Sequence, residues 1–238
     1  MSVWTAKRFW NHADTIKVDG GYSVELDGRS VKTPAKAPLV VPTHTLAQAI
    51  ANEWDAQVEI IDPAMMPVTR TANSAIDKVA VQFKDVAEML AAYGDSDLLC
   101  YRATSPAELV QRQADQWDPV LDWAKQALSA HLVPVAGVMH QPQSASALVP
   151  LKDRVHRLTN FELAAFHDLV AISGSLVLAL AVVDEYLPVE HAWKIARLDE
   201  AWQEEQWGSD EEASALSEKK RADFVNAAWF FRACSRET

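Results

Sequence analysis

The sequence contains little glycine, little cysteine and less base than acid, and each shortage excludes a class of function. Only seven of the 238 residues are glycine, and none stands in a P-loop or a Gly-rich dinucleotide fingerprint, so no phosphate-cradling loop is predicted. The two cysteines, Cys100 and Cys234, lack a metal-type spacing and are expected to be buried free thiols. The net charge of −11 leaves no clustered Lys and Arg to displace counterions, so we expect no nucleic-acid partner.

Long hydrophobic runs are also absent. The longest extends over 15 residues from Leu169 to Val183 and is interrupted by Ser173, Gly174 and Ser175. A membrane-spanning helix needs about 20 apolar residues, so this run predicts a buried core helix and no membrane insertion. The first ten residues, MSVWTAKRFW, resemble neither a secretory signal nor an Arg- and Ser-rich presequence. We therefore expect a cytoplasmic protein.

The composition, 49% apolar and 23% charged, is that of a globular protein. Near the N-terminus, Tyr22, Val24 and Leu26 alternate with polar residues and lead into Asp27-Gly28, a pair typical of a two-residue hairpin turn. We expect β structure over residues 20–42, with a further strand at 39–41. The predicted fold class is α+β, with a β-rich N-terminal domain over residues 1–70 and a larger all-helical C-terminal domain over residues 71–238.

The rest of the chain contains helix-start signals. A Ser or Thr followed three residues later by Glu or Gln has the spacing of a capping box, in which side chains satisfy free backbone N–H groups. The four pairs are Thr45 with Gln48, Ser105 with Glu108, Thr159 with Glu162, and Ser209 with Glu212. Helices are expected near residues 46–58, 71–92, 106–130, 161–184, 189–207 and 210–233. A lone strand is predicted at 97–101 and a Pro-containing connector at 132–150.

The strongest enzymatic signal is the adjacent pair His167-Asp168 on a predicted helix. Metal-dependent phosphohydrolases use such a pair, because an imidazole and a carboxylate can bind one metal ion. Further ligands would have to come from other residues without ligand-type spacing: His131, His140, His156, His191 or Asp184. A pair on a helix face or between helices explains the dyad better, so we predict no catalytic residue, no metal and no cofactor.

Tryptophan is abundant, with nine residues, and most are expected in the core because a large ring gains most from burial. Trp54 is interpreted as structural, its ring filling the contact between the β-rich part and its first helix. Residues 199–212 differ, because they combine two tryptophans with seven acids and no base. Such a segment is either a hydrated helix face or a site for a basic partner. The predicted partner-binding residues are Asp199, Glu200, Trp202, Glu204, Glu205 and Trp207.

The charge of the chain is uneven, with a net of −1 over residues 1–80 and −10 over residues 81–238. This difference favours different roles for the two parts. From composition and spacing alone, the chain is an acidic binding protein.

Several strings of residues, in this order, resemble the ATP synthase assembly factor family (ATP-twelve), which chaperones the alpha subunit. They are Lys7-Arg8-Phe9-Trp10, Leu26-Asp27-Gly28-Arg29, Glu53-Trp54-Asp55, Asp97-Leu98-Leu99-Cys100-Tyr101-Arg102, Trp117-Asp118-Pro119 and Trp202-Gln203-Glu204-Glu205-Gln206-Trp207-Gly208. The resemblance covers nearly the whole chain. It implies a β-rich N-terminal part, a helical C-terminal part, no catalysis and no cofactor.

The resemblance also implies a function and a location. The protein would bind the free alpha subunit of ATP synthase and prevent its aggregation until beta subunits arrive. An acidic position just before Trp202 would be sensitive, and it falls on Asp199 or Glu200. The family is mitochondrial in eukaryotes, so the location would be the bacterial cytoplasm, or the mitochondrial matrix for a processed eukaryotic form. The alternatives are a helical adaptor with another client and a metal-dependent phosphohydrolase.

Overall fold

A computed structural model describes residues 7–235 of the chain. These residues form two compact units that interleave along the sequence. The first unit comprises the described residues up to Phe83, the short segment Thr159–Ala165 and the described residues from Trp229 onward. The second comprises Lys84–Leu158 and Phe166–Ala228. Residues 71–83, which the sequence placed in the helical domain, thus lie in the first unit with the sheet. None of the helices within residues 7–235 is both long and apolar enough to cross a membrane.

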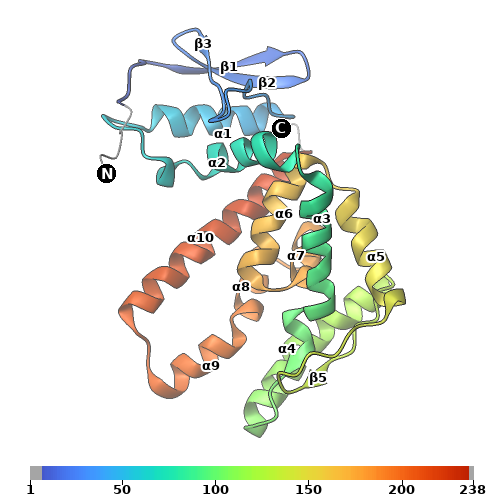
Figure 1. Ribbon diagram of the computed structural model, residues 1–238. Coiled ribbons are helices and arrows are strands. Elements are labelled where there is room, and N and C mark those ends of the chain that lie inside the picture. The colour runs from blue at the N-terminus through green and yellow to red at the C-terminus, as the bar shows by residue number, and fades with distance from the viewer. Residues whose placement is uncertain (1–6, 236–238) are drawn as a thin grey trace. The chain divides into compact units, whose positions relative to one another are not determined.

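The first unit contains a three-stranded antiparallel sheet in the order β1-β2-β3 (Figure 1). The strands are β1 (Ala13–Val18), β2 (Gly21–Leu26) and β3 (Arg29–Ser30). Asp27 and Gly28 have φ values of 47° and 77°, as a type I′ turn requires, so the predicted hairpin is confirmed. Strand β1 was not predicted. The segment predicted as a strand at 39–41 pairs with the sheet only through a bridge between Val41 and Tyr22.

Helix α1 (His44–Asp55) lies against the sheet in this unit, and α2 (Pro67–Ser74) packs on α1 (Figure 1). Leu46 and Ile50 of α1 are fully buried and join Val24 and Leu39 in one hydrophobic core. The N-cap of α1 is Thr43, whose hydroxyl accepts from the N–H of Leu46 at 3.3 Å. The predicted cap at Thr45 is therefore wrong by two residues. A 3₁₀ turn (Pro63–Met65) precedes α2, and a π-helical turn (Ala75–Val79) follows it.

The second unit is predominantly helical. Helix α7 (Leu176–Val183) forms its centre, and every residue from Leu176 to Val182 is buried. The predicted core helix over Leu169–Val183 is confirmed only for this part, because Gly174 breaks the run and Ala171 is exposed. Helix α4 packs on α7, and Trp117 of α4 is fully buried. The remaining elements of the chain are α3 (Phe83–Ala92), 3₁₀ turns at Tyr93–Ser96 and Leu98–Cys100, β4 (Tyr101–Arg102), α4 (Ala107–Ala127), β5 (Val135–Ala136), α5 (Ala145–His156), α6 (Asn160–Ser173), α7 (Leu176–Val183), α8 (Val189–Ala196), α9 (Leu198–Trp207) and α10 (Glu211–Ala233).

Several predicted helices are shorter in the structure than in the sequence reading. The helix predicted over 161–184 is broken at Gly174, which has a φ of 69°, and Ser175 then caps α7. The helix predicted over 189–207 is broken at Arg197, between α8 and α9. Residues 97–101 form mostly a 3₁₀ turn, with a two-residue strand after it. The segment 132–150, predicted to be a connector, contains the start of α5. This helix was not predicted, because Pro150 lies inside it.

The capping predictions are confirmed at one place in the second half of the chain. Thr159 and Glu162 form a reciprocal capping box, with distances of 2.8 and 3.2 Å. The helix after Ser105 has Pro106 at its N-cap and no side-chain cap bond. At the start of α10 the cap is Asp210, which accepts from the N–H of Ala213 at 3.0 Å, instead of Ser209. Neighbouring polar residues compete for a cap, and the local sequence does not decide between them.

Candidate partner-binding surface

The predicted binding residues lie on α9, between α8 and α10 in the second unit (Figure 1). Leu198 is the one residue of α9 that is buried. Gly208, with a φ of 89°, ends the helix, a conformation that glycine adopts without strain. Trp207, the last residue of α9, is 80% exposed. A surface tryptophan this exposed is typical of an interface anchor, because its ring gains much by burial.

Two acids of α9 form ion pairs with arginines of the same unit. The guanidinium of Arg112 on α4 donates to both carboxylate oxygens of Glu205, at 2.6 and 2.8 Å. This bidentate bond lowers the pKa of Glu205 and raises that of Arg112. Arg112 also lies over the ring of Trp202, 5.8 Å from its centroid. Glu204 accepts a bond of 2.8 Å from Arg197. These contacts hold α9 in place and neutralise two of its charges.

Asp199 and Glu200 are adjacent in sequence but differ in environment. The carboxylate of Asp199 accepts from the Nε2 of Gln113 at 2.7 Å. Gln113 is 1% exposed, and its Oε1 accepts from the N–H of Ala103 at 2.8 Å. Glu200 is exposed and makes no hydrogen bond or ion pair with the residues that the structure describes. Asp199 therefore positions α9 against α4, whereas Glu200 is available to a partner.

The exposed acidic surface continues beyond α9. Glu211 and Glu212 in the first turn of α10 are exposed, and Leu216 one turn later is 55% exposed. Both acids belong to the segment 199–212, but they are not among the predicted partner-binding residues. The pairing of Glu205 with Arg112 was missed, since the two residues are 93 positions apart and no local pattern relates them. We call Glu200, Trp207, Glu211 and Glu212 the acidic surface.

The His167-Asp168 dyad forms a local pair on α6. Nδ1 of His167 and Oδ1 of Asp168 are 3.0 Å apart, and this contact raises the pKa of His167. Two of the other candidate ligands are paired elsewhere, His140 with Asp95 at 3.3 Å and His156 with Glu88 at 3.4 Å. Among the described residues, no group of three His, Cys, Asp or Glu side chains could hold a metal ion. The dyad is a contact between adjacent residues of one helix, and the absence of a metal stays a prediction.

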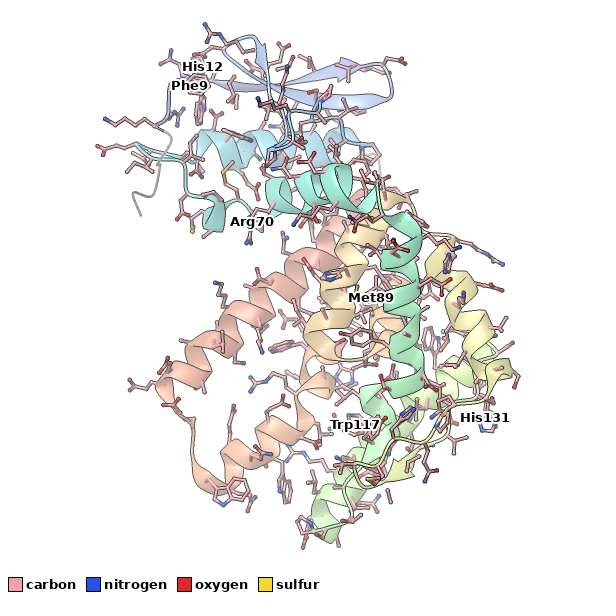
Figure 2. The ribbon with its side chains drawn as sticks, viewed as in Figure 1. Phe9, His12, Arg70, Met89, Trp117 and His131 are labelled. Atoms are coloured by element: carbon pink, nitrogen blue, oxygen red, sulfur yellow. The ribbon has the colours of Figure 1, made fainter. Side chains whose placement is uncertain are left out.

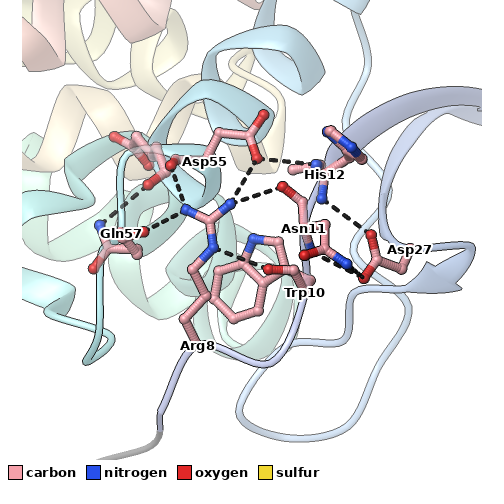
Figure 3. A network of polar contacts seen from close by, with 9 residues as sticks. Arg8, Trp10, Asn11, His12, Asp27, Asp55 and Gln57 are labelled. Atoms are coloured by element: carbon pink, nitrogen blue, oxygen red, sulfur yellow. Dashed lines mark hydrogen bonds and ion pairs between the residues drawn. The ribbon is translucent and has the colours of Figure 1, made fainter.

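Several of the strings that carry the family resemblance hold the first unit together. Arg8 donates to four backbone carbonyls, those of Trp10, Asn11, Asp55 and Gln57 (Figure 3). A guanidinium can meet so many acceptors because it has five N–H donors. The N-terminal segment is thereby tied to the end of α1. Across the same network, Asp27 accepts from the N–H groups of Asn11 and His12, which lowers its pKa.

The string Glu53-Trp54-Asp55 at the end of α1 reaches three other segments. Glu53 accepts from the backbone N–H groups of Val68 and Thr69 at 2.7 and 2.8 Å, and so caps α2. Burial raises the pKa of Glu53 despite these bonds. Trp54 is half-buried, and its ring meets that of Trp10 edge to face at 5.2 Å. Asp55 accepts from the N–H of Ala13, the first residue of β1, at 3.0 Å.

In the second unit, Asp97 accepts hydrogen bonds at the start of a helix, as Glu53 does in the first unit. It is fully buried and accepts from Leu99 N–H at 3.0 Å, Ser175 Oγ at 2.7 Å and Val177 N–H at 3.0 Å. Burial raises its pKa from 3.8 to about 6, although the three hydrogen bonds act in the opposite direction. Asp97 thus fixes the start of α7 against the turn that precedes β4.

Arg102 and Trp117 form a second set of contacts in this unit (Figure 2 labels Trp117). The guanidinium of Arg102 lies 5.3 Å from the centroid of the Trp117 ring and pairs with Asp118 at 2.7 Å. The indole N–H of Trp117 donates to the carbonyl of Ile195 on α8 at 3.1 Å. These bonds join α4, α8 and the segment at β4.

Comparison with known proteins agrees with the resemblance seen in the sequence. The family model of the ATP12 chaperone protein matches residues 7–125. The crystal structure of Atp12 from Paracoccus denitrificans has a TM-score of 0.92 at 47% identity, covering 96% of this chain and 98% of that one. An aspartate-to-lysine mutant of P. denitrificans Atp12p has the same TM-score of 0.92 and the same coverage, 96% and 98%, at 46% identity. The mitochondrial atp12 protein of Schizosaccharomyces pombe is 27% identical over 224 residues, 88% of this chain and 76% of that protein. This chain belongs to the ATP12 chaperone protein family.

Proposed function

We propose that the protein binds the free alpha subunit of ATP synthase and keeps it from aggregating until the beta subunits arrive. The observation that supports this most directly is the acidic surface of a chaperone-family chain, where Trp207 is 80% exposed beside unpaired acids. A monomer gains nothing from an exposed tryptophan, whereas a complex buries it. The proposal includes no catalytic step, no metal and no cofactor.

The physical demands of this task match the surface. A subunit destined for a ring exposes faces that the ring later covers, and exposed apolar patches cause aggregation. A chaperone must cover such a face and still be displaced. An interface with one or two aromatic anchors and a charged rim has this intermediate affinity, because rim charges speed association more than they slow dissociation. The acidic surface therefore suits a client face with basic residues around an apolar centre.

The residues of α9 divide into two groups in this proposal. Glu200 and Trp207, with Glu211 and Glu212 of α10, would contact the client. Asp199, Trp202, Glu204 and Glu205 would present them, since these four already have contacts within the unit. The sensitive acidic position falls on Asp199 or Glu200. If that position acts by contacting the client, it is Glu200; if it acts by positioning α9, it is Asp199. In P. denitrificans Atp12p an aspartate-to-lysine mutant keeps the fold, so charge reversal and unfolding can be separated.

The test is co-expression with the alpha subunit of ATP synthase, scored as soluble complex recovered on the tagged chaperone. Glu200→Lys changes the local charge by two units without removing any contact in the described part of the chain. We expect at least about a tenfold loss of affinity at low salt, because like charges face each other at the interface. The matched control is Asp153→Lys, the same change on the exposed face of α5.

Two further comparisons complete this test. Asp199→Asn should retain capture, because the amide oxygen can still accept from Gln113. Raised salt should weaken the wild-type complex, since exposed charges are screened over about 8–10 Å. Equal capture by Glu200→Lys and the control would remove Glu200 from the interface. Recovery of a different protein with no alpha subunit would instead favour the helical adaptor.

The bacterial source of the 47% identical relative supports a cytoplasmic location.

A further inference from the structure

The first unit contains a pocket that the proposed function does not use. Its volume is about 540 Å³, within the range typical of ligand sites. It is lined by the loop after β3, the end of α1, the segment before α2, and α2 with its π-helical turn. Trp54, Ile61 and Met66 make its walls mainly apolar. An apolar side chain of a partner would fit such a space.

Charge at the pocket favours an anionic group. Lys32 and Lys78 both line it, and neither forms an ion pair with another residue in the described part of the chain. Arg70, labelled in Figure 2, also lines the pocket, and its charge already acts on the carboxylate of Glu53. Asp77 also lines the pocket, but its carboxylate is held by the hydroxyl of Thr33 at 2.6 Å and the N–H of Ala35 at 3.0 Å. An approaching carboxylate therefore meets more positive than negative charge.

Two wall residues also carry buried polar atoms without a partner. Among residues 7–235, the indole N–H of Trp54 has no acceptor, and Oδ1 of Asn73 has no donor. A buried polar group left unpaired destabilises the protein, so a ligand that satisfies it gains by that interaction. Both atoms are covered from water. A peptide group carries both the acceptor and the donor that they lack.

We propose that this pocket binds an extended, acidic peptide segment of a partner protein. An apolar side chain of the segment enters between Trp54, Ile61 and Met66, and a neighbouring carboxylate contacts Lys32 and Lys78. The pocket selects the opposite charge from the acidic surface on α9 and α10, so one partner segment cannot suit both. The proposal does not depend on which client the acidic surface binds.

The experiment is a titration of the full-length protein with a capped pentapeptide of alternating leucine and glutamate, followed by NMR. The readout is the indole N–H signal of Trp54, identified by its loss in Trp54→Phe. We expect a saturable shift of this signal with a dissociation constant of roughly 0.1–1 mM, a range suited to a short peptide. A control peptide with lysine in place of glutamate should bind at least about tenfold more weakly.

A pair of variants ties the binding to this pocket. Lys78→Glu reverses an exposed charge at the pocket, and Lys17→Glu makes the same change on β1, away from it. We expect Lys78→Glu to weaken peptide binding at least about tenfold and Lys17→Glu to leave it unchanged. The dispersed indole signals report whether each variant is folded. No shift of the Trp54 signal, equal binding of the two peptides, or equal binding by the two variants would each overturn the proposal.

Discussion

Asp97 offers a sharp test of the energetics of the second unit. Its carboxylate is fully buried, and burial raises its pKa from 3.8 to about 6. The folded state therefore holds this proton more tightly than the unfolded state does. The resulting contribution to stability is complete below about pH 4 and is lost as the pH rises through about 6. A shift of about two units corresponds to about 3 kcal/mol, of which about 2 kcal/mol falls between about pH 4.5 and 7.5.

The perturbation is Asp97→Asn, which cannot titrate. Asparagine keeps one oxygen for the bonds from Leu99 and Ser175 but turns an amide towards the N–H of Val177. The absolute stability of the variant combines a lost bond with a removed buried charge, and these oppose each other. The pH dependence isolates the carboxylate, because every other titrating group is common to both proteins.

The assay is urea unfolding of the wild type and Asp97→Asn, followed by circular dichroism at several pH values between about 4.5 and 7.5. We expect the stability of the wild type relative to the variant to fall by about 2 kcal/mol across this range. Asp153→Asn, at an exposed position of the same unit, should show no comparable change. If the difference in stability between the wild type and Asp97→Asn did not change with pH, the hydrogen bonds to Asp97 would cancel the cost of burying its charge. A difference that grows with pH would mean that they exceed it, and would refute the reasoning.

Three further predictions concern other contacts. Trp54→Arg should lower the free energy of unfolding by about 2–4 kcal/mol, because it removes the half-buried ring on Trp10 and adds a charge there; an unchanged midpoint in chemical unfolding would contradict this placement. His167→Ala should change the free energy of unfolding by no more than about 0.5 kcal/mol and leave client capture unchanged. If elemental analysis found a stoichiometric metal in the wild type that this substitution removes, the dyad would not be a purely local contact. Arg112→Ala should release Glu205 and speed amide hydrogen exchange in α9 while the melting midpoint stays nearly constant; unaltered exchange would show that the ion pair does not hold the helix.

Local signals in the sequence were sufficient for part of the fold. The Asp27-Gly28 turn and the Thr159 capping box depend on neighbours in the chain, and the structure contains both. Strand β1 was missed because Asp14 and Lys17 make its polar alternation weak, although pairing with β2 stabilises it. Helix α5 was missed because a proline inside a helix is uncommon. These elements form because of tertiary contacts, which no short window of sequence contains.

The candidate site was predictable as a segment but not in its detail. The acidic run lies on α9 and ends at the exposed Trp207, and its role in binding stays a prediction. The division of its acids into paired and unpaired could not be read from the sequence. It depends on Arg112, which lies 93 residues away, and on Gln113 beside it.

The contrast between Asp199 and Glu200 shows why an acidic run does not translate directly into a binding site. Successive residues of a helix point in directions about 100° apart, so adjacent acids cannot share one environment. Asp199 reaches the buried Gln113, and Glu200 faces solvent. Many of the strings that carry the family resemblance behave like Asp199: Arg8, Glu53, Asp97 and Arg102 all bind atoms within their own unit. The resemblance therefore reports the fold directly and the client only through it, whereas in the proposed function the client is recognised by exposed charges that the fold leaves unpaired.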